Sequence, residues 1–100
     1  MSSLSLDQYV VDVLLPDLVG HDKSPSAFLV YLYLWRAAGT RGHVQVSYTT
    51  IAVDTGLSRA GAQRAVAILK RRKLLAVAKA SPTAVPDYRV ARPWLGRMPA

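Results

Sequence analysis

Two helix-start signals lie close together near the middle of the chain, and their spacing constrains the fold more than any other feature. Ser47 and Ser58 each precede a stretch of helix-forming residues, and serine is a favoured N-cap. Gly56, just before the second start, tolerates the positive φ that a sharp turn requires. We therefore expect two helices joined by a tight turn, one over residues 48–54 and one from Ser58 to about Lys73.

The second of these helices has an apolar and a polar face. Ala62, Val66 and Leu69 share one stripe at helical spacing, which predicts that they are buried. Ile51 and Leu57 supply further apolar contacts between the two helices. The residues predicted to face away are polar or small: Arg59, Ala60, Gln63, Arg64 and Ala67.

The flanking segments suggest another helix and three strands. Residues 26–38 are apolar on nearly every face, with Arg36 as their only charge, and Gly39 ends them. Alternation of polar and apolar residues predicts strands at 43–47, 74–79 and 87–91, the last two forming a hairpin. These elements predict a mainly α fold with a small β-hairpin, which is an α+β class.

The first 24 residues leave two structures open. Asp7 is a possible helix cap, but Pro16 interrupts a helix because it lacks an N–H. The valine-rich run 9–14 is equally compatible with an extended segment followed by a short helix from Pro16. In either case we expect residues 1–24 to pack their apolar side chains on the core.

Charge divides the chain into two parts. The protein has 100 residues, 13 Lys and Arg against six acids, and a net charge of +7. Residues 1–35 contain one Lys and four Asp, a net charge of −3, whereas residues 36–100 contain 12 Lys and Arg and two Asp, a net charge of +10. A basic field of this size indicates a polyanionic partner, most often nucleic acid.

Several classes of protein are not expected. The chain has no cysteine, and His21 and His43 have no further ligands at metal-binding spacing, so we predict no metal and no cofactor. It contains neither a phosphate-binding glycine loop nor a nucleophile motif, so we predict no enzyme activity and no identifiable small-molecule ligand. No run reaches the ~18 apolar residues of a membrane span and no signal peptide is visible, which favours a cytoplasmic protein without membrane contact.

The segment from Ser47 to Leu69 resembles the helix-turn-helix family. The strand pair that follows is similar to the wing of winged helix-turn-helix domains, and the resemblance covers roughly residues 25–91. It extends to replication initiator-type proteins of plasmids and phages and to small bacterial regulators, in which an apolar segment precedes a helix like that of residues 31–34. The matching helix-turn-helix residues are Ala52, Gly56, Leu57, Ser58, Ala62, Ala65, Val66 and Leu69.

This resemblance implies a domain plan and shows two departures from the family. The plan is a winged helix-turn-helix domain at 25–91, with the helix-turn-helix at 47–73 and the wing at 74–91, and a flexible tail at 92–100. Trp94 and Leu95 are the candidates to tether the start of this tail. Ala62 stands where the family prefers Val or Ile, which suggests a shallow core. Gly61 stands where Thr is common, either as a weak but tolerated helical residue or to let the backbone approach DNA closely.

The resemblance also implies a mode of DNA binding. The N-terminal part of the second helix would enter the major groove, with the preceding helix across the backbone. Arg59, Gln63 and Arg64 would then contact bases, because Arg pairs with guanine and Gln with adenine. Each group has an alternative interpretation. The arginines could be ordinary solvated side chains, the hydroxyls could only stabilise caps and turns, and the wing residues could be polar surface of an exposed hairpin. The expected DNA-backbone contacts are Tyr48, Thr49, Ser58, Lys79 and Arg89.

The basic run 70–73 allows two interpretations. Cations in the last turn of a helix stabilise its dipole, and they also attract phosphates without sequence preference.

The function expected first is binding of double-stranded DNA, by a transcriptional regulator or by the DNA-binding part of a replication or maintenance protein. The alternative is a winged-helix module that binds proteins without sequence-specific DNA binding. RNA binding ranks lower, because no sheet with exposed stacking aromatics is predicted.

A helix that is apolar all round needs cover from the N-terminal segment or from a second subunit. We predict a homodimer built from residues 4–38, with Phe28, Tyr31, Leu34 and Trp35 at its interface.

Overall fold

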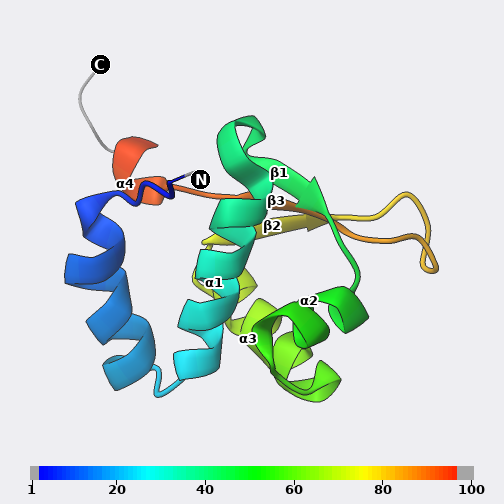
Figure 1. Cartoon of the computed structure of the whole chain (residues 1–100), viewed down its shortest axis with the longest axis horizontal. Coiled ribbons are helices and arrows are strands. Elements are labelled where there is room, and N and C mark those ends of the chain that lie inside the picture. Colours follow the sequence, from blue (N-terminus) through cyan, green and yellow to red (C-terminus); the bar gives the residue numbers. More distant parts are fainter. Residues whose placement is uncertain (1–2, 97–100) are drawn as a thin grey trace.

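The computed structural model describes residues 3–96 and shows helices around a small sheet (Figure 1). The strands are β1 (His43–Gln45), β2 (Leu75–Ala78) and β3 (Asp87–Val90). The predicted α+β class is confirmed. The helical elements are η1 (Val10–Leu14), η2 (Asp17–His21), α1 (Pro25–Ala38), η3 (Gly39–Arg41), α2 (Tyr48–Thr55), α3 (Arg59–Arg71) and α4 (Pro93–Gly96).

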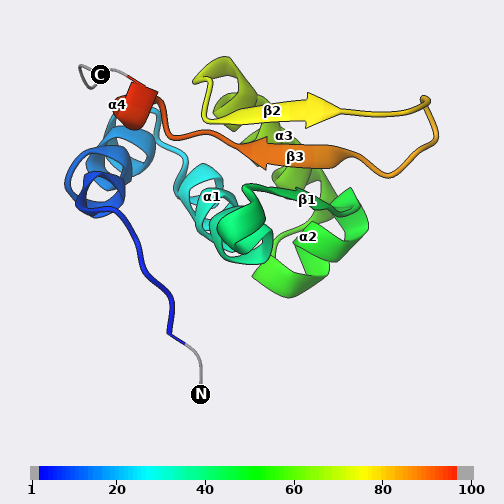
Figure 2. The same cartoon turned by 90° about the horizontal axis from the view of Figure 1, so that it is seen from above.

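The three strands form one antiparallel sheet in the order β1-β3-β2. Tyr88 of β3 lies opposite Val44 of β1 and Val77 of β2, and all three point toward the helices. Each strand is shorter than its alternating sequence pattern by one or two residues. The loop between β2 and β3 projects from the side of the molecule that carries α2 (Figure 2).

Helix α1 is the centre of the core. Ser24 caps it, since its Oγ accepts a hydrogen bond from the Ala27 N–H at 3.2 Å, and Pro25 occupies the first helical position. The helix packs against α2, α3, β1, β3 and η2, so its own chain covers nearly every face.

The expected dimer contact is therefore wrong for all four side chains named. Phe28, Tyr31, Leu34 and Trp35 are buried within one copy of the chain. They are covered because the N-terminal segment lies along one side of α1 and the helix-turn-helix along the other (Figure 1).

The N-terminal segment is helical rather than extended. Val10, Leu14 and Leu18 are buried at every fourth position, which suits a helix lying on α1, whereas a strand would bury alternate residues. Pro16 stands between two π-helical turns, in which the Leu15 N–H bonds to the Val10 carbonyl and the Asp22 N–H to the Asp17 carbonyl. The helical segment thus accommodates Pro16 because the turns before and after it are wider π-helical turns.

The start of the expected flexible tail is ordered by aromatic packing. Trp94 stacks on Tyr9 at 4.5 Å between ring centroids and lies near Trp35 at 6.3 Å. Its Nε1–H donates to Asp7 Oδ2 at 3.0 Å. Trp94 therefore tethers the start of the tail as expected, and residues 97–100 lie outside the described part of the chain.

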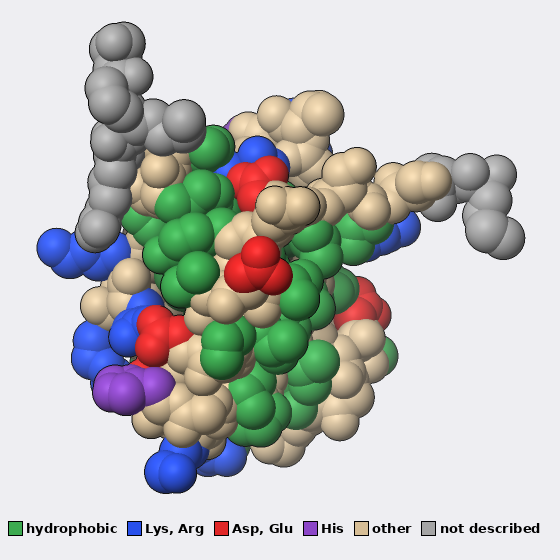
Figure 3. Space-filling view, turned by 90° about the vertical axis from the view of Figure 1, so that its left-hand side faces the viewer, with side chains coloured by type: hydrophobic (Ala, Val, Ile, Leu, Met, Phe, Trp, Pro, Cys, Tyr) green, Lys and Arg blue, Asp and Glu red, His purple; other side chains and the backbone are tan. Residues whose placement is uncertain are grey.

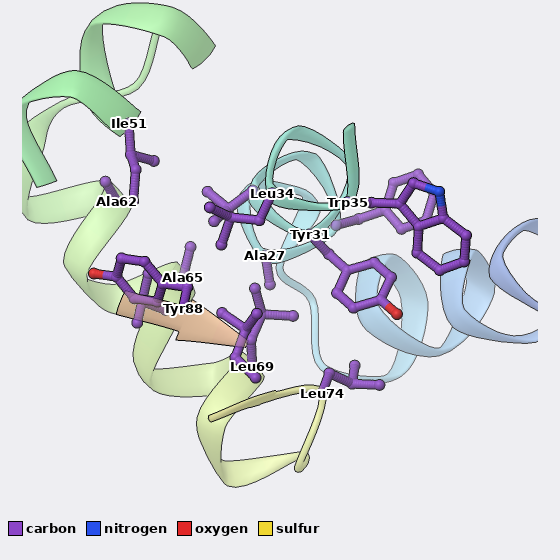
Figure 4. Packing of buried hydrophobic residues seen from close by; sticks show 14 of the residues in the cluster. Ala27, Tyr31, Leu34, Trp35, Ile51, Ala62, Ala65, Leu69, Leu74 and Tyr88 are labelled. Atoms are coloured by element: carbon purple, nitrogen blue, oxygen red, sulfur yellow. The ribbon is translucent and has the colours of Figure 1, made fainter. Parts of the chain in front are cut away.

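The core beneath α3 is filled from the sheet. Ala62 and Ala65 have small side chains, and the ring of Tyr88 lies beside them (Figure 4). Tyr88 is 0% exposed, so it supplies the volume that a larger residue at position 62 would supply. The shallow core expected under Ala62 is thus compensated by a large side chain from β3.

Helices able to span a membrane, by length and apolar character, do not occur between residues 3 and 96.

Candidate nucleic-acid interface

Local hydrogen bonds fix the turn between α2 and α3. The Ser47 Oγ accepts from the Thr50 N–H at 3.1 Å, and the Ser58 Oγ accepts from the Gly61 N–H at 2.9 Å. Gly56 has a φ of +80°, and its N–H bonds to the Ala52 carbonyl. Both predicted caps and the predicted glycine turn are confirmed, and the two helices begin where those signals place them.

The cap of α3 explains why position 61 is a glycine, and neither sequence-based interpretation included this reason. An added Cβ would lie 3.0 Å from the Ser58 Oγ, the atom that caps α3. The glycine therefore gives space to the cap. Gly61 also lines the depression that Arg64 borders, so a close approach of its backbone to DNA stays a prediction.

The face of α3 turned away from the core is open to solvent. Ala62, Val66 and Leu69 are buried as predicted. The exposed side chains along the helix are Arg59, Ala60, Gln63, Arg64, Ala67, Lys70 and Arg71. This face is free of large apolar side chains and carries four cations and one amide, a set that suits base edges and phosphates.

The three predicted base-contacting residues lie at different places along and around α3. Arg59 lies at the first position of α3, and Gln63 follows one turn later. Arg64 borders a depression of about 300 Å³ between α3 and the loop before α1. Asp22, Lys23 and Ser24 line the same depression, so this flank of α3 carries a second cation and an acid from a distant part of the sequence. The acid is the one that also approaches Arg72.

The hydroxyl groups predicted for the DNA backbone lie at two helix starts. Tyr48 and Thr49 open α2, where Thr49 is exposed and Tyr48 half-buried. Ser58 precedes α3, and its Oγ is occupied as an acceptor while its proton stays available to an acceptor. The start of α2 and the start of α3 are separated by the length of α2, so these hydroxyls could reach different phosphates.

The wing residues are placed apart from one another. Lys79 begins the projecting loop, and its Nζ lies 3.5 Å from the Pro82 carbonyl. Arg89 is exposed within β3, opposite His43 and Ala76. Because neighbouring Tyr88 points inward, Arg89 points to the sheet face away from the helices. The structure therefore does not bring Arg89 together with Lys79 at the loop.

The basic run at the end of α3 is divided by acidic residues. Arg72 forms an ion pair with Asp17, and its Nε lies 3.5 Å from Asp22 Oδ2. Lys70, Arg71 and Lys73 are exposed. The N-terminal segment thus anchors one cation of the run, and the remaining three form no ion pair within residues 3–96.

Three tyrosines have raised pKa values in this fold. Burial is the main cause for Tyr31, and the pKa of Tyr33 rises to about 12 through burial and its hydroxyl's 2.6 Å hydrogen bond to Asp54. Burial also raises the pKa of Tyr88, followed by its interaction with the neighbouring Tyr48. Of these, only Tyr88 lies next to a residue predicted to contact DNA.

Sequence reasoning missed three residues at this surface. Lys23 is far from the helix-turn-helix in the sequence, but the fold places it at the same depression as Arg64. Arg72 was grouped with the basic run, although it pairs with the N-terminal acids. Tyr88 could have been found from the sequence. The alternation of residues 87–91 places it on the inner face of a strand, and Ala62 and Ala65 leave space for a large side chain beside α3.

Comparison with known proteins gives one family match. A family model described as a helix-turn-helix domain matches residues 21–75, which is more than half of the chain. No curated protein and no solved structure shows significant similarity to it. With its two capped helices, glycine turn and antiparallel hairpin, the chain belongs to the helix-turn-helix domain family and has the winged form of that fold.

Proposed function

We propose that the protein binds double-stranded DNA with sequence preference, as a transcriptional regulator or as the DNA-binding part of a replication or maintenance protein. One observation carries the proposal: the exposed face of α3 presents Arg59, Gln63 and Arg64 in its first two turns. A helix of this kind fits the major groove, where these side chains match guanine and adenine edges. No metal, cofactor or catalytic group is part of the proposal.

Backbone contacts would come from three elements around α3. Tyr48, Thr49 and Ser58 offer hydroxyls at the starts of α2 and α3, and Lys79 stands where the wing loop begins. Lys23 adds a cation at the depression that Arg64 borders. Arg89 is the weakest member of the predicted set, because it faces the outer side of the sheet.

Selection from a random duplex library, followed by fluorescence anisotropy on the selected site, tests this proposal. Arg64→Ala should weaken binding by ~1–3 kcal/mol and relax base preference at one position. Lys79→Ala should weaken all duplexes about equally, because a phosphate contact carries no sequence information. Arg36→Ala, an exposed cation on α1, is the matched control and should leave affinity nearly unchanged.

Two outcomes of this experiment oppose the proposal. If no duplex is enriched, sequence preference is absent. If the Arg64 and Lys79 variants lose the same affinity on every sequence, the assignment of base and backbone roles is wrong.

A second candidate function is protein binding through the face opposite the wing. Hydrophobic side chains gather on that face over the N-terminal segment (Figure 3). Val11, Val13 and Leu29 are among the exposed ones. The predicted homodimer would have to use such side chains, because Phe28 and the others named for it are in the core. Sedimentation at micromolar concentration distinguishes a 10.9 kDa monomer from a dimer.

A further inference from the structure

The hydroxyl of Tyr88 is a buried polar group without a hydrogen bond. Tyr88 is 0% exposed, and its Oη has no partner among the residues that the structure describes. A buried donor left unpaired carries the full penalty of its desolvation. A phenylalanine would fill the same space beside Ala62 and Ala65 without this penalty, so the hydroxyl needs an explanation.

The nearest candidate partner is Tyr48. The two rings meet edge to face with centroids 6.5 Å apart. The hydroxyl of Tyr88 points away from the buried side chains of Leu69 and Leu74 (Figure 4). Tyr48 lies close enough to raise the pKa of Tyr88, while the geometry of the two hydroxyls falls short of a hydrogen bond in this conformation.

Tyr48 occupies a position suited to a phosphate. It is the first residue of α2, where the helix dipole and free N–H groups favour an anion. The N–H groups of Thr50 and Ile51 are already bonded to Ser47, so the side-chain hydroxyl of Tyr48 is an additional donor at this end. Tyr48 is half-buried, so part of it is open to a ligand.

We propose that Tyr88 is a positioning residue for DNA binding: its O–H donates to the Tyr48 oxygen, which leaves the Tyr48 O–H to donate to a backbone phosphate. The direction of donation follows from the chemistry, because phosphate oxygens only accept. Tyr48 must therefore donate outward, and its oxygen accepts from the one buried donor beside it. A small rotation of Tyr48 completes both bonds when DNA binds. The inference rests on the proposed DNA binding.

The test measures affinity and folding of four proteins: the wild type, Tyr48→Phe, Tyr88→Phe and the double variant. Affinity is measured by anisotropy with a labelled 30-base-pair duplex, and stability by thermal melting. Tyr88→Phe should bind three- to tenfold more weakly while melting at the same or a higher temperature. Tyr48→Phe should lose a similar factor, and the double variant should lose no more than Tyr48→Phe alone.

Tyr31→Phe is the matched control, because Tyr31 is another buried tyrosine whose hydroxyl donates to the Ala91 carbonyl at 2.9 Å, away from α2 and α3. It should melt at a lower temperature and keep its DNA affinity. The inference is overturned if Tyr88→Phe binds as the wild type does, if it behaves like the control, or if the two losses multiply. A wild-type protein that binds no duplex would overturn the proposed function itself, which is a separate result.

Discussion

At the scale of single residues, the caps and turns of this protein leave little freedom for substitution. Gly61 is the clearest case, because its missing side chain makes room for the hydroxyl that caps α3. Helix propensity alone would favour alanine at this position. The cap and the propensity therefore oppose each other, and a substitution can measure which is larger.

We predict that Gly61→Ala lacks the full gain that alanine normally brings to a helix, with a net effect between a gain of ~0.5 and a loss of ~1.5 kcal/mol. Displacing the Ser58 cap costs ~0.5–2 kcal/mol, while replacing a helical glycine by alanine returns ~0.5–1 kcal/mol. Gly20→Ala is the matched control, since nothing lies within 4 Å of its added Cβ. It should gain ~0.5–1 kcal/mol. Urea denaturation of both variants measures the difference, and a Gly61→Ala protein that gains as much stability as Gly20→Ala would contradict the role given to the cap.

At the scale of elements, the N-terminal segment and α3 are joined by charge as well as by packing. Asp17 and Asp22 of this segment both approach Arg72 at the end of α3. Asp22 is only 13% exposed at its side chain, so water screens this contact less than an open surface pair. The pairing thus connects the first segment of the chain to the helix proposed to bind DNA.

Removing the guanidinium should therefore loosen this connection. Arg72→Gln is expected to lose ~1 kcal/mol of unfolding free energy, more than an exposed ion pair contributes. Lys70→Gln, an exposed cation on the same helix, should change stability by less than ~0.5 kcal/mol. Chemical denaturation at low salt compares the two. Equal effects of both substitutions would show that the contact with Asp17 and Asp22 adds nothing.

A charge introduced into the central helix α1 should have a different effect from a charge introduced at a dimer interface. Leu34 is fully buried in a single copy of the chain. Leu34→Glu should therefore unfold the protein, because a charge without a partner cannot be buried in this core. Circular dichroism checks this outcome. A folded, monomeric Leu34→Glu variant would instead support the dimer contact that the structure argues against.

The sequence predicted those elements whose signals are local. Ser47, Ser58 and Gly56 act through bonds within a few residues, so α2, α3 and the turn could be placed from the sequence alone. The segment before α1 could not be assigned, because its valines and Pro16 favour different structures. Packing on α1 selects the helix, and that contact is not visible in the segment itself.

The site was predictable to a similar degree and for the same reason. Arg59 and Gln63 follow from the periodicity of α3, and the structure finds them exposed. Lys23 beside Arg64, and Tyr88 beside Tyr48, join residues that are 41 and 40 positions apart, and only the tertiary fold brings them together.

At the scale of the whole molecule, the fold should be sensitive to alkaline pH. The pKa of Tyr33 is raised to about 12, and those of Tyr31 and Tyr88 are raised as well. Each unfolded tyrosine loses its proton near pH 10, while the folded one keeps it. Their contribution to stability is therefore complete below pH 10 and is lost as the pH rises through the folded pKa values.

We expect the free energy of unfolding to fall above pH 10, by up to ~1.4 kcal/mol per pH unit for each fully buried tyrosine. Urea denaturation at pH 9, 10 and 11 measures the slope. Tyr31→Phe should make the decline shallower, because it removes one of the titrating groups. A stability that stays constant to pH 11 would contradict the burial assigned to these hydroxyls.

Binding of double-stranded DNA is the central claim, and its dependence on salt tests the claim most directly. The exposed cations around α3 and the wing loop are Lys23, Arg59, Arg64, Lys70, Arg71, Lys73 and Lys79. If about six of them meet phosphates, a plot of log K against log salt concentration should have a slope of about −5. Anisotropy titrations with a labelled duplex between 50 and 200 mM salt provide this slope. A slope near zero, or no duplex binding at the lowest salt concentration, would contradict the claim.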